Sequence, residues 1–163
     1  MSAPIHVLVA VDGSDDSNRA GLVAAGLFGA SAQYTFVHVA EAVPMTPPNR
    51  MPLSGAGVAP AVPHGVAPDE PGGANDVKDS ARAIALAAAT SVGVDVTETI
   101  GLLGDPARAI VGAATERGAD VIVVGAHERG WLAELFTSSV LDDIQHLATI
   151  PVLVVPHLAH PDD

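Results

Sequence analysis

The stretch DVIVVGAHERGWLAELFTSSVLDDIQHLATIPVLVVP, residues 120–156, decides the fold. Residues 121–124 form a continuous β-branched run, which predicts a strand buried on both faces of a parallel sheet. Ser138 and Ser139 then open a helix, and Val152–Val155 predicts a second buried strand. Such a unit brings a loop and a helix N-terminus to the carboxyl end of the sheet. Ligands of α/β proteins bind there, and backbone N–H groups at a helix start favour anions.

The remainder of the chain repeats this alternation of strand and helix. The predicted strands cover residues 5–11, 33–39, 94–100, 121–124 and 152–155, and the predicted helices cover 15–28, 76–91, 106–118 and 139–149. Ser14 or Asp15 is the expected N-cap of the first helix and Asp105 that of the third, where Pro106 suits the first helical position. Asp142 has capping-box spacing to Ser139. The pattern predicts a single α/β domain of the doubly wound, Rossmann-like or flavodoxin-like type. Its five-stranded, mainly parallel sheet would carry helices on both faces.

Residues 44–75 interrupt the alternation. They are crowded with Pro and Gly and show neither the strand nor the helix period. Because so long a stretch without structure is unusual inside a compact domain, we expect a flexible surface insertion. It is either a loop without a role or a cover over the ligand cleft. The expected organisation is one domain over residues 1–156 that contains this insertion, followed by a short tail at 157–163.

Composition narrows the classes of function. Hydrophobic residues make up 48% of the 163 residues and cysteine is absent, which predicts a globular core and excludes disulfides and thiolate catalysis. The formal net charge of −12 disfavours nucleic acid and anionic lipid as partners, because both require clustered Lys and Arg. No apolar run approaches the roughly 18 residues of a membrane span, so the expected location is the cytoplasm.

The loop after residues 121–124 resembles, in part, the phosphate-binding motif of a known family. That motif is Gly, two residues, Gly, nine residues, and then Gly followed by Ser or Thr. Gly125 stands at the first glycine position, Glu128 and Ser138 occupy the next two glycine positions, and Ser139 provides the hydroxyl that follows. The closing strand of this pattern is Pro-Val-Leu-Val-Val at residues 151–155.

On these residues the chain resembles the universal stress proteins. Asp-Gly-Ser at residues 12–14, between the first strand and its helix, and His-Val-Ala-Glu at 38–41 extend the resemblance over nearly the whole chain. The resemblance implies ATP or another adenine nucleotide, with Mg²⁺, with Asp12 beside the ribose and phosphates and the end of the second strand on adenine. The candidate binding residues are Asp12, Gly13, Ser14, Val39, Gly104, Gly125, Glu128, Arg129, Gly130, Ser138 and Ser139. The resemblance also implies a homodimer through the last strand, 152–155.

The two replaced glycines bear on phosphate binding. A carboxylate at Glu128 about 4 Å from a phosphate oxygen would cost about 4 kcal/mol at an effective dielectric constant of 20. A side chain at Ser138 would obstruct the close approach of backbone that glycine allows. Arg129 and Gly130 would offset the charge if the loop turned Glu128 outward and Arg129 inward.

Three hypotheses for function follow. The first is a regulatory or binding protein that depends on an adenine nucleotide. The second is a dimeric interaction module that does not bind nucleotide, and the third is a slow ATP hydrolase that uses Asp12 and a metal ion. Enzymes are the weaker class because no Walker A loop, Rossmann fingerprint or nucleophile elbow is present. Purely structural interpretations also stand: an Asx turn at Asp12, and helix capping at Gly104 and Asp105.

Overall fold

A computed structural model describes residues 3–41, 73–126 and 139–157. Its elements are β1 His6–Ala10, α1 Asp15–Phe28, β2 Gln33–Ala40, α2 Ala74–Val92, β3 Val96–Leu103, α3 Pro106–Arg117, β4 Val121–Gly125, α5 Ser139–Leu147 and β5 Val152–Val155. The strands form one five-stranded sheet in the order β3-β2-β1-β4-β5, and every pair of neighbours is parallel. The predicted doubly wound α/β fold is therefore confirmed.

The sheet changes direction at β1. From β1 the chain moves outward through β2 to β3, and later returns to place β4 on the other side of β1, with β5 beyond it. The junction between β1 and β4 is therefore the point at which the strand order reverses. In open α/β sheets the carboxyl end of this junction is the crevice where ligands bind.

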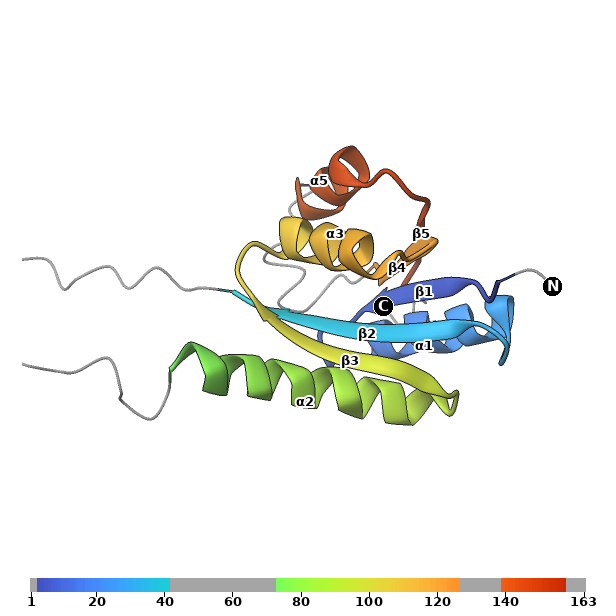
Figure 1. Ribbon diagram of the computed structural model, residues 1–163, viewed down its shortest axis with the longest axis horizontal. Coiled ribbons are helices and arrows are strands. Elements are labelled where there is room, and N and C mark those ends of the chain that lie inside the picture. Colours follow the sequence, from blue (N-terminus) through green and yellow to red (C-terminus); the bar gives the residue numbers. More distant parts are fainter. Residues whose placement is uncertain (1–2, 42–72, 127–138, 158–163) are drawn as a thin grey trace, which may run out of the picture.

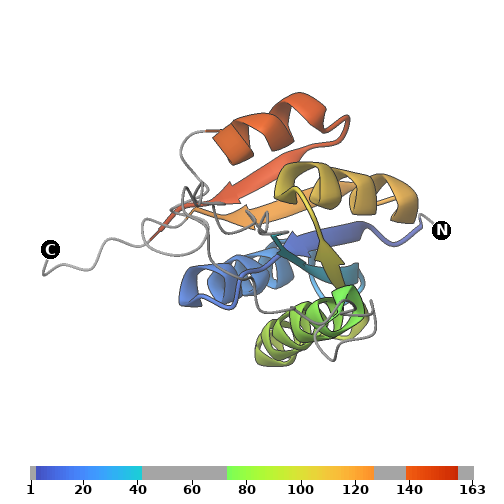
Figure 2. The same cartoon turned by 90° about the vertical axis from the view of Figure 1, so that its left-hand side faces the viewer.

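Helices cover both faces of the sheet (Figure 1). Figure 2 shows α1 and α2 on one side and α3 and α5 on the other. Side chains alternate between the two faces along each strand: Val7 and Val9 pack with the first helix pair, whereas Leu8 and Ala10 pack with the second. Because both faces are covered, the central strands β1 and β4 are mainly apolar runs.

Small residues let α2 lie close against β3. Ala81, Ala85, Ala88 and Ala89 form its buried face. A Cβ added at Gly101 in β3 would lie 2.0 Å from the backbone oxygen of Lys78. In a chain with only 3% aromatic residues, this close approach of backbones compensates for the scarcity of bulky side chains.

Several element boundaries differ from the predicted ones. β3 runs from Val96 to Leu103 instead of 94–100, because its carboxyl half continues to pair with β2 as far as Ala40. α2 begins at Ala74, so the last two residues assigned to the insertion 44–75 are helical. α5 ends at Leu147, two residues before the expected end. Most of the insertion, at residues 44–72, and the tail from residue 158 fall outside the described residues.

No helix within the described ranges combines the length and the apolar character needed to cross a membrane.

Candidate functional site

The turn between β1 and α1 is built around Asp12. Its Oδ1 accepts a hydrogen bond from Ser14 N at 2.9 Å and another from the Ser14 hydroxyl. Ser14 Oγ in turn accepts from Ser17 N at 3.2 Å and is the N-cap of α1. Both sequence-based interpretations, the Asx turn and the cap, are confirmed. Gly13 lies between them with φ of +84°, a backbone conformation that glycine adopts at little cost.

The hydrogen bonds of this turn do not involve the second carboxylate oxygen of Asp12. Oδ2 is buried and has no hydrogen-bond partner among the described residues. A buried acceptor without a donor costs about 1–3 kcal/mol, and more when the group is charged. The Asx turn therefore explains only half of this side chain. Oδ2 suits a hydroxyl donor or a hydrated Mg²⁺ ion, the two groups that the family resemblance places beside this residue.

The carboxyl end of β2 extends past its last backbone hydrogen bond to β1 within the described residues. The last rung between the two strands is the hydrogen bond from Val11 N to Val37 O, at 2.9 Å. Alternate residues of a parallel strand turn their backbone groups to the same neighbour. Val39 therefore directs its N–H and C=O toward β1, beyond this last rung. Asp12 stands at the same level, because each lies two residues past the register pair Ala10–Val37.

Gly104 follows the edge strand β3. Its N–H donates to Ala40 O at 2.9 Å, and its φ of +140° is one that side chains rarely adopt. The next residue, Asp105, caps α3 by accepting from Arg108 N at 2.9 Å. The capping interpretation is thus confirmed for Asp105. Since β2 separates β3 from β1, the structure places Gly104 one strand farther from Asp12 than Val39.

Gly125 ends β4 directly against the start of α1. A Cβ added to Gly125 would lie 2.9 Å from Asp16 O and 3.2 Å from the carbon of the same carbonyl. Both are backbone atoms, which move only with the helix. Glycine is therefore required here for the contact between β4 and α1. The contact also holds the carboxyl ends of β1 and β4 side by side.

The rest of the predicted phosphate loop lies beyond this point. Glu128, Arg129, Gly130 and Ser138 fall outside the described residues. Ser139 is the first residue of α5, as the predicted helix start at residues 138 and 139 requires, and the capping box between Ser139 and Asp142 stays a prediction. Asp142 lies in the first turn of α5, where a carboxylate complements the helix dipole.

A contact that sequence reasoning missed ties the segment after β5 to α1. His157 Nδ1 and Asp16 Oδ2 are 2.8 Å apart, with Asp16 only 12% exposed at its side chain. Arg19 donates to the carbonyl oxygen of Pro156. Residue 157 was expected to belong to the tail. Its partner lies 141 positions away in sequence, so no local sequence pattern predicts this contact.

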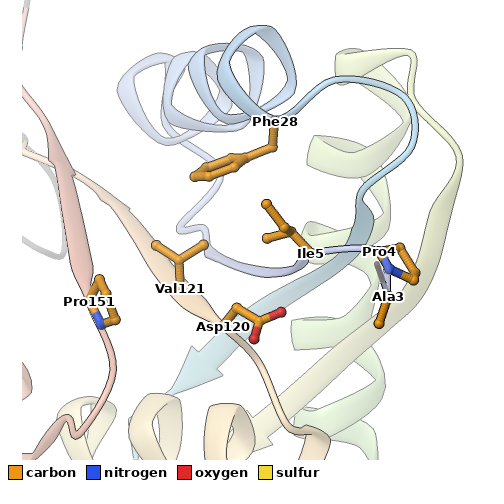
Figure 3. Close-up of a pocket in the computed structure, with 7 residues that line it drawn as sticks. All are labelled: Ala3, Pro4, Ile5, Phe28, Asp120, Val121 and Pro151. Carbon is orange, nitrogen blue, oxygen red and sulfur yellow. The ribbon is translucent and has the colours of Figure 1, made fainter. Parts of the chain in front are cut away.

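A cavity lies at the opposite, amino end of the sheet (Figure 3). It is an open, largely apolar groove of about 540 Å³ lined by Ala3, Pro4, Ile5, Phe28, Asp120, Val121 and Pro151. Figure 3 shows Phe28, Ile5 and Val121 turned toward one another, with the carboxylate of Asp120 as the polar group. That carboxylate already accepts from His6 N at 2.8 Å. None of the predicted site residues lines this groove, so the groove and the Asp12 region are separate sites.

Comparisons with known proteins agree with this architecture. The model of the universal stress protein family matches residues 5–156. The universal stress protein YxiE of Bacillus subtilis (strain 168) is 35% identical over 153 residues, which are 91% of this chain and 97% of YxiE.

Two solved structures share the fold. A universal stress protein in complex with cAMP has a TM-score of 0.56 at 24% identity, covering 94% of this chain and 98% of that one. The universal stress protein of Archaeoglobus fulgidus in complex with dAMP has a TM-score of 0.52 at 21% identity, covering 94% and 99%.

The fold and the turn at Asp12 define a doubly wound α/β protein with polar groups at the carboxyl end of β1, where the strand order reverses. The chain belongs to the universal stress protein family. Among the residues that the structure describes, no group of three or more His, Asp or Glu side chains is arranged to hold a metal ion on its own.

Proposed function

We propose that this chain binds an adenine nucleotide, ATP with Mg²⁺, at the carboxyl end of β1, β2 and β4, and acts as a regulatory or binding protein. The observation that carries the proposal is the buried Oδ2 of Asp12, which has no partner among the described residues. Relatives of the same fold have been solved in complex with cAMP and with dAMP, which supports an adenine nucleotide as the ligand class.

The proposed roles use the described geometry around Asp12 and, for the loop after β4, the family resemblance. Asp12 Oδ2 accepts from a ribose hydroxyl or holds a water of the Mg²⁺ ion. The N–H and C=O of Val39 meet the donor and acceptor edge of adenine. Gly13, Ser14 and Gly125 form the floor of the site, and the loop with Glu128, Arg129, Gly130, Ser138 and Ser139 takes the phosphates. Gly104 borders the site from β3.

Charge makes Mg²⁺ part of the proposal. The chain has 19 acidic and 7 basic residues, a formal net charge of −12. A free triphosphate approaching such a protein is repelled by the summed field. Mg²⁺ neutralises part of the triphosphate charge, so the complex of ATP with Mg²⁺ binds better than ATP alone.

Thermal unfolding tests the proposal. A ligand that binds only the folded state stabilises it by about 2.7 kcal/mol at a concentration of 100 Kd. ATP with Mg²⁺ should therefore raise the melting temperature, and GTP with Mg²⁺ should raise it less because its base reverses the donor and acceptor pattern. Equal melting temperatures with and without ATP, at millimolar ligand, would contradict nucleotide binding.

The alternative is a dimeric interaction module of the same fold, located in the cytoplasm, that does not bind nucleotide. Glu128 and Ser138 at two glycine positions favour it. Both versions of the proposal include a homodimer through β5, an edge strand whose Val152, Leu153 and Val154 are only partly buried. Release of ADP above a control without protein would support the third class, a slow ATP hydrolase.

A further inference from the structure

We infer that His38 is a positioning residue for the nucleotide base, because its side chain takes the place of a backbone rung between β1 and β2. The inference rests on the proposed function and deepens it. His38 is 8% exposed, and its Nδ1 lies 2.8 Å from the carbonyl oxygen of Val11. A carbonyl oxygen only accepts hydrogen bonds, so Nδ1 carries the proton and donates.

The pairing pattern shows which rung His38 replaces. Gln33 N donates to Ile5 O at one end of the ladder, and Val11 N donates to Val37 O at the other. Continuing this parallel pattern by one step would have Val39 N donate to Val11 O. Within residues 3–41 that bond does not form, and Val11 O accepts from the imidazole instead.

At the level of Val39, β2 stays paired with β3. Gly104 N donates to Ala40 O at 2.9 Å, and the β2–β3 register continues to the pair Ala40–Leu103. At this level β2 therefore separates from β1 and stays paired with β3. This separation releases the Val39 N–H at the level of Asp12, with its donor directed into the proposed site. The carbonyl oxygen of Val11 accepts its hydrogen bond from His38, so this bond does not use the Val39 N–H.

Selectivity for adenine follows from this arrangement. A free Val39 N–H donates to N1 of adenine, which accepts. Hypoxanthine carries a proton at N1, so inosine triphosphate sets one donor against another. Loss of His38 would let Val39 N close onto Val11 O and remove the preference for ATP over inosine triphosphate.

Two variants of matched shape test the role of the imidazole donor. In His38→Asn the amide nitrogen stands as many bonds from the backbone as Nδ1 and can still donate to Val11 O. In His38→Leu a methyl group occupies that position and cannot donate. Titration calorimetry with ATP and inosine triphosphate, each with Mg²⁺, measures selectivity. A through-bond NMR coupling between Val39 N and the Val11 carbonyl carbon measures the rung without any ligand.

The inference predicts that H38L loses about tenfold in ATP affinity, as expected for one hydrogen bond. Its affinity for inosine triphosphate stays unchanged, and the Val39–Val11 coupling appears. H38N keeps the selectivity of the parent and shows no coupling. Unchanged selectivity in H38L, or equal loss in both variants, would overturn the inference. Should H38L fail to fold, H38N decides: retained selectivity supports the role and lost selectivity overturns it.

Failure of the proposed function gives a different result. If the parent binds neither nucleotide, the proposed function is wrong and the coupling alone decides about His38. A coupling that appears only in H38L supports the inference. A coupling already present in the parent, or absent from all three proteins, overturns it.

Discussion

At the residue scale, the two oxygens of Asp12 have opposite surroundings. Oδ1 holds the turn through Ser14, while Oδ2 is buried without a partner in the described part of the chain. A residue that served only the turn would not require a buried charge, because a neutral amide oxygen accepts the same hydrogen bonds. Binding and stability therefore make different demands on this side chain.

Asp12→Asn separates these demands. The amide oxygen keeps the turn and the buried charge is removed, so we expect the melting temperature of the free protein to stay equal or rise. A hydrogen bond to a charged acceptor is worth about 1.5–3 kcal/mol, so affinity for ATP with Mg²⁺ should fall at least about tenfold. Asp105→Asn, at the N-cap of α3, is the control and should leave the affinity unchanged. A lower melting temperature with unchanged affinity would make Asp12 purely structural.

Tyr34 gives the chain a stability term that depends on pH. Its side chain is fully buried and its hydroxyl donates to Gly29 O at 2.8 Å. Burial raises the pKa of Tyr34 above its usual value near 10. Because the folded pKa is the higher one, this contribution is present below the unfolded pKa and is lost as pH rises through the folded pKa.

Tyr34→Phe should remove this alkaline loss. At neutral pH the variant should lose about 1 kcal/mol, since Gly29 O loses its donor. Above pH 10 the difference between parent and variant should shrink and then change sign. Urea unfolding at several pH values measures the difference, and tyrosinate absorbance follows the only tyrosine of the chain directly. A difference independent of pH would show that Tyr34 ionises equally in both states.

At the element scale, β4 and α1 meet through a glycine. Gly125→Ala would bring a Cβ to 2.9 Å from Asp16 O, and overpacking of this kind costs about 1–3 kcal/mol. The matched control is Gly112→Ala within α3, where an added Cβ has no neighbour within 4 Å. Alanine there should stabilise by about 0.5–1 kcal/mol. Opposite shifts in denaturant unfolding are expected, and equal shifts would contradict the contact.

Comparison of the elements also shows which features the sequence patterns could predict. Continuous apolar runs such as residues 121–124 predicted the buried strands, and local spacing predicted the caps Ser14 and Asp105, because both signals lie within one element. The bonds from His38 to Val11 O and from His157 to Asp16 join elements far apart in sequence. Their partners are known only when the strand order is known. For that reason, the turn and the caps near the candidate site could be predicted from sequence, but the hydrogen bonds between distant elements could not.

At the scale of the whole molecule, β5 is the edge available for a second copy. Ile122 N donates to Pro151 O at 3.0 Å, and Ala126 N, directly after β4, donates to Val155 O at 2.7 Å. The backbone groups of these alternate residues therefore face β4, and those of Val152 and Val154 face outward. An apolar edge of this kind favours pairing. The expected assembly is a dimer of about twice the 16.4 kDa chain mass.

Val154→Pro tests the dimer without disturbing the β4–β5 ladder. Proline removes an N–H that faces away from β4, which edge strands tolerate, so light scattering should show a folded monomer. Val154→Thr keeps the N–H and should remain dimeric. A parent that is monomeric at every concentration would contradict the assembly, as would a dimer that persists in the proline variant.

The central claim concerns location, because the buried carboxylate oxygen of Asp12 lies toward one end of the sheet and the apolar groove lies at the other. Titration of isotope-labelled protein with ATP and Mg²⁺, followed through backbone amide resonances, distinguishes the two ends residue by residue. We predict that Gly13, Ser14, Val39 and Ala126 shift while the groove residues Ile5, Phe28 and Val121 stay unchanged. Shifts confined to the groove residues, or no shifts at millimolar ATP, would contradict the account.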